Sequence, residues 1–405
     1  MNKEELLKQY KEYQNQNLHL DLSRGKPDKE QLDLSLPMMD VLSSKENYLS
    51  EEGIDVRNYG ELTGITECKR LMSNILEVPE KNIIIFGNSS LQMMYDQISR
   101  SFTHGVCGNT PWYKLNKIKW LCPVPGYDRH FSITEHFGIE MINIPMNNDG
   151  PDMDLVESLI KDESVKGIWC VPKYSNPSGI TYSDEIVRRF ARLKPAAKDF
   201  RIYWDNAYAM HGFNEDKKLL NIYEEAKKNN NEDIVYIFTS TSKITFPGGG
   251  IAALGASENN IKDIKSQLKY QIISFDKINQ LRHVRYFKDY QGMKEHMKKH
   301  LVLLKEKFDL VDSILKEEVS NLATWNKPEG GYFICLYVKN KAKEVIDRCL
   351  KCGLKLTDAG ATHPYHKDES NSYIRIAPTY ASLDELRLAV SILCLSIKIE
   401  LYEDK

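Results

Sequence analysis

The sequence predicts an α/β protein with a large domain, whose mostly parallel sheet is sandwiched by helices, and a smaller α+β domain. Two observations support the large domain. Apolar strand-like runs alternate with amphipathic helical stretches from about residue 60 to 260. Glycine-rich and polar turns follow the ends of the strand-like runs. The smaller domain is predicted because the pattern changes near Tyr290 to one long amphipathic helix, followed by short strands between helices.

Composition narrows the class of protein. The chain has 405 residues, enough for a sizeable core and two or three structural units. The net charge of −2 gives no general basic field for nucleic acid. No apolar run approaches the ~20 residues of a membrane span. Eight cysteines are scattered through the chain, as is usual for reduced thiols in a cytoplasmic protein. We therefore expect a cytoplasmic enzyme without nucleic-acid or membrane partners.

The N-terminal stretch begins as an amphipathic helix within residues 1–20 and continues as an extended arm. The segment from Leu20 to Asp28 then ends in turn residues. Gly25 can bring its backbone amide close to a ligand, and Arg24 and Lys26 place positive charge beside it. A surface turn is the alternative interpretation of this segment.

Two polar turns precede predicted helices. Tyr59 lies in a glycine-punctuated loop before a helix that begins near Ile65, so it is either a ligand contact or a turn aromatic. The stretch from Asn82 to Tyr95 is typical of a strand, a tight turn and a helix. Ser89 and Ser90 occupy the helix entry, where free amides and hydroxyls can bind a phosphate. The alternative is that Asn88 or Ser89 only caps the helix.

Three further strands end in chemically distinctive residues. Tyr127 follows the strand that begins near Lys119, and its ring can stack on a flat ligand. Asn176 follows the strand that begins near Val165 and offers a side-chain amide. Asp205 ends the strand that begins at Phe200, with Tyr208 three residues further on. A carboxylate at the end of a buried strand requires a positive partner.

Lys243 follows the strand-like run from Ile234 to Phe238. Desolvation at such a position lowers the pKa of a lysine and favours the neutral amine, which can form a Schiff base with a carbonyl cofactor. Ser240 and the glycines 248–250 could hold a phosphate nearby. In a parallel sheet, ligands bind at the carboxyl ends of the strands. We therefore expect the polar residues after these strands to form one site, and these are Ser89, Tyr127, Asn176, Asp205 and Lys243.

The C-terminal part carries a long amphipathic helix from Met293 to Leu315. His296 and His300 lie four residues apart on it; a solvated helix face is favoured over a metal pair, since no third ligand is evident. Strands are predicted at 330–338 and 373–377, and helices at 341–352 and 383–397. Arg375 is a charged residue in a short apolar strand, so it is either paired with an acid or binds a carboxylate.

Six short motifs carry a family resemblance through their order and spacing. They are Ser23–Asp28, Tyr59–Gly64, Ser175–Gly179, Asp205-x-x-Tyr208, Ser240-x-Ser-Lys243 and Arg375. The pattern resembles the pyridoxal-phosphate-dependent aminotransferases of the aspartate aminotransferase fold (class I/II), in particular the bacterial-type aspartate aminotransferases. The resemblance implies fold type I, with an N-terminal arm and part of the small domain at 1–50, a large cofactor-binding domain at 51–290 and a C-terminal small domain at 291–405.

The resemblance also implies roles for residues at the cofactor. Lys243 would be the aldimine lysine and would move the proton between the substrate and the cofactor. Asp205 would pair with the pyridinium nitrogen. The remaining cofactor-binding residues would be Asn176 and Tyr208 at the phenolic oxygen, Tyr127 on the ring, Ser89, Ser90 and Ser240 at the phosphate, and Tyr59 from the other subunit of a homodimer.

For the substrate, Arg375 would bind the α-carboxylate, helped by Asn176 and the Gly25 amide. Arg24 is the first candidate for a side-chain carboxylate; Lys26, Lys277 and Arg282 are alternatives. The implied reaction transfers an amino group from L-aspartate to 2-oxoglutarate by a ping-pong mechanism. An alanine or aromatic aminotransferase, or a β-elimination lyase, would use the same residues. Many relatives carry a phosphate-binding arginine eight residues after the lysine, where this chain has Ile251.

Overall fold

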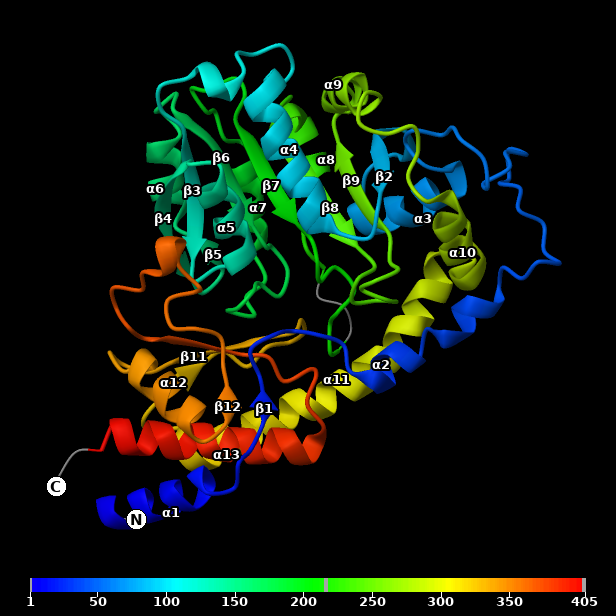
Figure 1. Cartoon of the computed structure of the whole chain (residues 1–405). Helices are drawn as coiled ribbons and strands as arrows, with labels where there is room; N and C mark the ends of the chain where they lie inside the picture. The colour runs from blue at the N-terminus through cyan, green and yellow to red at the C-terminus, as the bar shows by residue number, and fades with distance from the viewer. Residues whose placement is uncertain (1, 215–217, 403–405) are drawn as a thin grey trace.

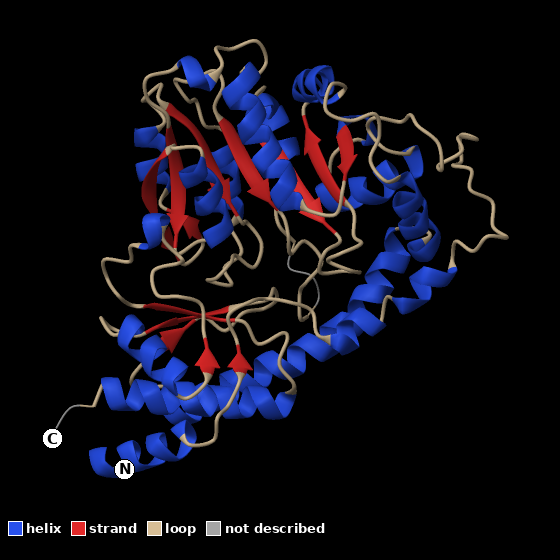
Figure 2. Cartoon of the chain, viewed as in Figure 1, coloured by secondary structure: helices blue, strands red, loops and turns tan. Residues whose placement is uncertain are grey.

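The computed structural model describes residues 2–214 and 218–402. It has a large unit built on a broad sheet and a smaller unit that contains both chain ends (Figure 1). This arrangement confirms the predicted α/β fold class, because helices cover both faces of the large sheet (Figure 2). Among the described helices, none is both long and apolar enough to cross a membrane.

The large sheet has eight strands in the order β2-β9-β8-β7-β6-β3-β4-β5. Neighbours from β8 to β4 are parallel, whereas β9 is antiparallel to both β8 and β2, and β5 is antiparallel to β4. The strands β2, β3, β6, β7 and β8 therefore share one direction and end at one edge of the sheet. The strand bounds are β2 Ile83–Phe86, β3 Lys119–Val124, β4 Glu140–Asn147, β5 Gly150–Pro151, β6 Val165–Cys170, β7 Arg201–Asp205, β8 Val235–Ser240 and β9 Ala252–Ala256.

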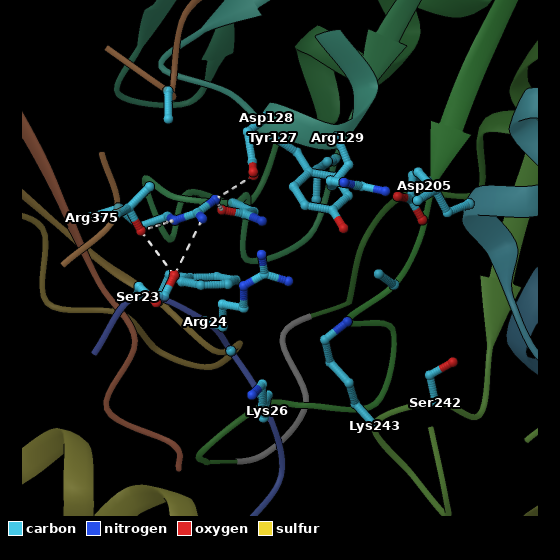
Figure 3. A pocket seen from close by; sticks show the side chains of 18 of the residues that line it. Ser23, Arg24, Lys26, Tyr127, Asp128, Arg129, Asp205, Ser242, Lys243 and Arg375 are labelled. Carbon is cyan, nitrogen blue, oxygen red and sulfur yellow. Dashed lines mark hydrogen bonds and ion pairs between the residues drawn. The ribbon is translucent and has the colours of Figure 1, made fainter. Parts of the chain in front are cut away.

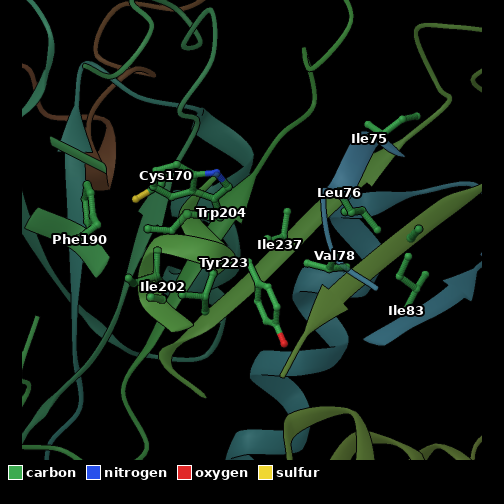
Figure 4. Close-up of a cluster of buried hydrophobic side chains, with 14 of the residues drawn as sticks. Ile75, Leu76, Val78, Ile83, Cys170, Phe190, Ile202, Trp204, Tyr223 and Ile237 are labelled. Carbon is green, nitrogen blue, oxygen red and sulfur yellow. The ribbon is translucent and has the colours of Figure 1, made fainter. Parts of the chain in front are cut away.

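The central strands are apolar on both faces because both faces are covered. In β7, Ile202 and Trp204 join one hydrophobic cluster, while Tyr203 between them joins another on the opposite face. Figure 4 shows part of the first cluster, where Ile202 and Trp204 lie among side chains from neighbouring elements. The first cluster includes residues of α3 (Thr66–Leu76), α6 (Met153–Leu159), α7 (Asp184–Ala191), α8 (Ile222–Lys228) and α10 (Lys277–Phe287); the second includes residues of α4 (Ser90–His104), α5 (Asp128–His136) and α9 (Glu258–Leu268).

The smaller unit joins the N-terminal arm to the C-terminal part. Its three-stranded sheet has the order β10-β11-β13, and β1 pairs in parallel with β12. The helix α1 lies beside α13, so the first and last helices pack together (Figure 1). The bounds are α1 Lys3–Gln14, β1 Leu20–Asp21, α2 Lys29–Asp33, α11 Tyr290–Val319, β10 Thr324–Trp325, β11 Ile334–Tyr337, α12 Ala342–Lys351, β12 Leu354–Lys355, β13 Tyr373–Ile376 and α13 Leu383–Glu400. Short 3₁₀ turns occur at 36–40, 80–82, 112–114, 232–234 and 364–366.

Two histidines of the long helix α11 differ from the expectation that they lie on a solvated face. His296 and His300 are buried rather than on a solvated face. The Nε2 atoms of the two rings lie 3.1 Å apart, and His296 Nε2 also lies 2.8 Å from the carbonyl oxygen of Ile244. Gln31 of α2 contacts His300 Nδ1 at 3.4 Å. The prediction was wrong because the sequence does not reveal that α2 and the Lys243 loop cover this face of the helix.

Candidate active site

A cavity of about 470 Å³ lies where the carboxyl ends of the large-sheet strands face the smaller unit. It is lined by the predicted site residues except Tyr59 and two of the alternative cations, Lys277 and Arg282. Figure 3 shows Asp205, Lys243 and Ser242 from the large unit and Ser23, Arg24 and Arg375 from the smaller one. The predicted residues on its walls are Arg24, Gly25, Ser89, Ser90, Tyr127, Asn176, Asp205, Tyr208, Ser240, Lys243 and Arg375.

Lys243 extends into the cavity from the turn that follows β8. Its Nζ lies 5.1 Å from the ring centroid of Tyr208 and 5.8 Å from that of Tyr332. Burial lowers the pKa of Lys243, and the nearby carboxylate of Asp205 partly opposes this effect. The His211 ring contacts the backbone carbonyl of Lys243 at 3.2 Å. This setting makes a neutral, nucleophilic amine more accessible than at an exposed lysine.

Asp205 ends β7 and is buried beside His130 of α5. Its Oδ2 lies 3.0 Å from His130 Nε2, whereas its Oδ1 is buried without any hydrogen-bond partner among the described residues. The His130 ring stacks on Trp169 at 4.5 Å and meets the ring of Tyr127 edge-on at 4.9 Å. Burial raises the pKa of Tyr127 to about 12. The second oxygen of Asp205 is thus available to accept a hydrogen bond from a ligand in the cavity.

Arg375 lies in β13, where its guanidinium group is held on several sides. Its Nη1 donates to Asp128 Oδ1 at 2.8 Å and contacts Asn176 Oδ1 at 3.3 Å. Its Nε donates to Thr357 Oγ1 at 3.1 Å. The group lies 4.9 Å from the ring centroid of Phe333, which fixes its plane. Arg375 is therefore paired with an acid and also lines the cavity that a substrate carboxylate would enter.

Gly25 is required by close packing beside this arginine. A Cβ atom at Gly25 would lie 2.7 Å from the Phe333 ring, so a side chain there would displace the ring under Arg375. Arg24 and Lys26 also line the cavity. Figure 3 shows Arg24 extending toward its centre, between Arg375 and Lys243 in this view. Arg24, Lys26 and Arg375 therefore line the same cavity as Lys243 and Asp205.

Part of the cavity lining is formed by the hydroxyl groups of Ser89, Ser90, Ser240 and Ser242. Ser89 is the N-cap of α4, and its Oγ accepts from the Gln92 amide at a long 3.4 Å, so the capping interpretation applies at least in part. Ser240 Oγ donates to Ser242 Oγ at 3.0 Å, and Ser242 donates to the Asn88 carbonyl at 3.0 Å. Ile251, by contrast, is buried in the apolar core below the sheet edge.

Three predicted candidates lie elsewhere. The Tyr59 side chain is 78% exposed and does not line the cavity. Lys277 is buried, and its Nζ donates to the carbonyls of Asn58 and Gly60 at 2.6 and 2.9 Å, so it anchors the Tyr59 loop. Arg282 pairs with Asn279 and also lies outside the cavity lining. Of the four cations considered for a side-chain carboxylate, Arg24 and Lys26 are the two at the cavity.

The sequence interpretation missed Asp128 and His130, which contact Arg375 and Asp205. Both follow Tyr127 at the start of α5. A signal was present, because residues at the start of a helix that follows a strand end lie beside the ligand-binding edge. Their partners come from strands 75 and 247 residues away along the chain. Such pairings depend on the fold rather than on local pattern.

The fold is that of the fold type I aminotransferases. The distant α-aminoadipate aminotransferase of Thermus thermophilus, complexed with N-(5'-phosphopyridoxyl)-L-leucine, shares the fold with a TM-score of 0.77 at 17% identity, covering 97% of this chain and 94% of that one. The family model for aspartate aminotransferase matches residues 2–404. The chain belongs to this family, and it is an aminotransferase.

Two comparisons with proteins of one species show much higher sequence identity to this chain. The aspartate aminotransferase of Corynebacterium glutamicum is 41% identical over 392 residues, which are 96% of this chain and 90% of the relative. A crystal structure of an aspartate transaminase from that species has a TM-score of 0.95 at 40% identity, covering 99% of this chain and 96% of that one.

Proposed function

We propose that the protein transfers the amino group of L-aspartate to 2-oxoglutarate, with pyridoxal phosphate as its cofactor, in a ping-pong reaction. The observation that carries this proposal is the charge layout of one cavity. Lys243 and the carboxylate of Asp205 share one cavity with the cations Arg375, Arg24 and Lys26. A dicarboxylate substrate fits these cations because it carries two negative groups. The close relative that is named aspartate aminotransferase supports the same substrate.

The residues present fit pyridoxal phosphate. Within the described part of the chain, the buried Oδ1 of Asp205 has no hydrogen-bond partner, as expected for an oxygen that accepts from a protonated ring nitrogen. Tyr127 would cover the ring, and Asn176 and Tyr208 would contact its phenolic oxygen. The helix entry with Ser89 and Ser90, together with Ser240, would hold the phosphate. When bound, pyridoxal phosphate supplies an electron sink for negative charge at the substrate Cα.

Lys243 is the proton carrier in this proposal. Its Nζ has a pKa lowered by burial, so it can release and accept a proton near neutral pH more readily than an exposed lysine. Asp205 would keep the ring nitrogen protonated, and His130 would hold the Asp205 carboxylate in place through its Oδ2. The cavity walls formed by Tyr127 and Tyr208 limit water around the reacting amine.

The second subunit of a homodimer would complete the site. Tyr59 is exposed on a loop that Lys277 holds in a defined shape. A rigid loop with an outward aromatic residue suits a contact with a partner's cofactor phosphate, and Tyr59 would serve the partner rather than its own cavity. The predicted cytoplasmic location belongs to the same proposal.

The test compares wild type with the Arg24→Ala variant by their kcat/KM values for L-aspartate and for L-alanine. We expect kcat/KM for L-aspartate to fall by at least about tenfold, or ~1.4 kcal/mol of transition-state binding, and that for L-alanine to change by less than about twofold. Arg70→Ala is the matched control, because Arg70 pairs with Glu51 outside the cavity. The cofactor absorption band should decline on addition of L-aspartate and return with 2-oxoglutarate.

Other outcomes separate the alternatives. If the cofactor absorption band responds to alanine or aromatic amino acids but not to aspartate, the proposed cofactor is correct and the proposed substrate is wrong. Release of ammonia without a need for a 2-oxo acid would indicate a β-elimination lyase. An unchanged kcat/KM for L-aspartate in Arg24→Ala would exclude Arg24 as the group that binds the side-chain carboxylate of the substrate.

A further inference from the structure

We propose that Asp128 controls substrate affinity by competing with the substrate α-carboxylate for Arg375. The pair formed by Asp128 Oδ1 and Arg375 Nη1, 2.8 Å apart, lies within the cavity lining. A negative side chain thus already occupies the guanidinium group that is expected to bind a negative substrate. This inference rests on the proposed role of Arg375 in carboxylate binding.

The hydrogen-bond donors of Arg375 make the competition concrete. A guanidinium group has five N–H donors. The Nε donor is used by Thr357, Nη1 contacts both Asp128 and Asn176, and Nη2 contacts the Ser23 carbonyl at a long 3.4 Å. One N–H of Nη2 is left. A two-point grip on a carboxylate needs two parallel N–H groups, so at least one protein acceptor must give way.

Asp128 is the acceptor best able to leave. The side chain of Asp128 is 26% exposed, whereas that of Arg375 is 6% exposed. Thr357 and Asn176 are buried, and the Ser23 contact is made by a backbone carbonyl. Asp128 is also the first residue of α5, at the edge of the cavity, where a carboxylate can turn toward water. It is the only acceptor of the four with a negative charge, so a substrate carboxylate repels it directly.

This arrangement would weaken binding of every substrate that carries an α-carboxylate. The substrate gains the Arg375 contact only after the ion pair with Asp128 has been broken, and the product leaves as that pair forms again. Asp128 would therefore hold the Michaelis constant above the value that Arg375 alone could give, without taking part in the chemical step.

The test uses Asp128→Asn in the enzyme loaded with pyridoxal phosphate. Asparagine keeps the shape and removes the competing charge. We expect the dissociation constants of succinate and propionate, measured by calorimetry, each to fall by about three- to tenfold. The KM values of L-aspartate and L-alanine should fall together, so that their ratio stays within about twofold of the wild-type ratio. Dissociation constants within twofold of wild type, or higher, would overturn the proposal.

Two further variants isolate the charge effect. Asp128→Glu keeps the negative charge and should bind both carboxylates within about twofold of wild type; tighter binding there would overturn the charge explanation. Asp184→Asn is the matched control, since Asp184 is also in the first turn of a helix and pairs with Arg188 at 3.4 Å outside the cavity. It should leave both dissociation constants unchanged.

Arg375→Lys separates this inference from the proposed function. If that variant binds propionate more weakly than wild type, Arg375 binds carboxylates. If Asp128→Asn then binds propionate with the wild-type dissociation constant, only the proposed competition by Asp128 is wrong. If Arg375→Lys binds propionate as the wild type does, the proposed substrate site itself fails, and the inference fails with it.

Discussion

At the scale of single residues, Lys243 is under two opposing influences. Burial among Tyr208, Tyr332 and the cavity wall lowers its pKa, while the negative charge of Asp205 raises it. Burial is the larger effect, so the pKa lies below the ordinary lysine value of 10.5. The Asp205 charge therefore limits how reactive the free amine becomes before the cofactor binds.

Asp205→Asn is expected to increase the reactivity of Lys243 in the cofactor-free protein. Removing the negative charge lowers the pKa of Lys243 further, so a larger fraction of the amine is neutral at any pH below that pKa. Labelling of Lys243 by trinitrobenzenesulfonate at pH 8, followed by peptide mass spectrometry, should become at least about twofold faster. Above the wild-type pKa the two proteins should react alike.

The exposed Lys298 serves as the internal control for this labelling. It lies on the surface of α11 and pairs with Glu295, so its rate should not change with the substitution. Slower labelling of Lys243 in Asp205→Asn would contradict the assigned balance of burial and charge.

At the scale of secondary-structure elements, two helix entries organise the cavity. The first turn of α5 supplies Asp128 and His130, preceded by Tyr127, so one helix end contacts both Arg375 and Asp205. The entry of α4 supplies Ser89 and Ser90 to the same cavity. Because Ile251 stands in the core, free helix amides and hydroxyls would have to provide much of the phosphate binding.

The double variant Ser89→Ala, Ser90→Ala tests this role of α4. We expect the dissociation constant for pyridoxal phosphate to rise by at least about tenfold, because two hydroxyl donors are removed from the phosphate end. Fluorescence titration of the cofactor-free protein measures it. The loss of the Ser89 cap alone should also lower the free energy of unfolding by about 0.5–2 kcal/mol.

Ser257→Ala distinguishes these two effects. Ser257 caps α9 through the Asn260 amide at 3.2 Å, away from the cavity. Because Ser257 Oγ also donates to Asp233, this control should lose at least as much free energy of unfolding, and it should keep the wild-type affinity for the cofactor. An unchanged affinity in the double serine variant would show that these two hydroxyls do not bind the cofactor phosphate.

The element scale also explains what could be predicted from the sequence. Alternating apolar runs located the strands, and the turns after them located Ser89, Tyr127, Asn176 and Asp205 at one sheet edge, because those patterns are local. The partners of these residues could not be located in this way. The pairing of Asp128 with Arg375 and the burial of His300 under α2 depend on contacts between segments far apart in the sequence. Lys277 was likewise a candidate because it is a cation, but its side chain anchors a loop instead of binding a ligand.

At the scale of the whole molecule, the cavity depends on both units. Its large-unit wall comes from the strand ends, and its small-unit wall comes from β13 and the segment after β1. One hydrophobic cluster joins them, since Tyr208 of the large unit packs in the same cluster as Leu22 and Phe333. The exposed Tyr59 is the predicted site residue that a single chain leaves outside, which is why a second subunit enters the proposal.

Mixed dimers test whether Tyr59 serves the partner subunit. Lys243→Ala removes the reactive amine, and Tyr59→Ala removes the proposed phosphate contact, so each homodimer should have little activity. In a hybrid dimer, one of the two cavities combines Lys243 from one subunit with Tyr59 from the other. After unfolding and refolding of an equal mixture, about a quarter of the cavities should be intact, and activity should recover to about that fraction of wild type. Refolding each variant separately controls for damage. If Tyr59 served its own cavity, no hybrid cavity would contain both groups, and mixing would give no recovery beyond the average of the two variants.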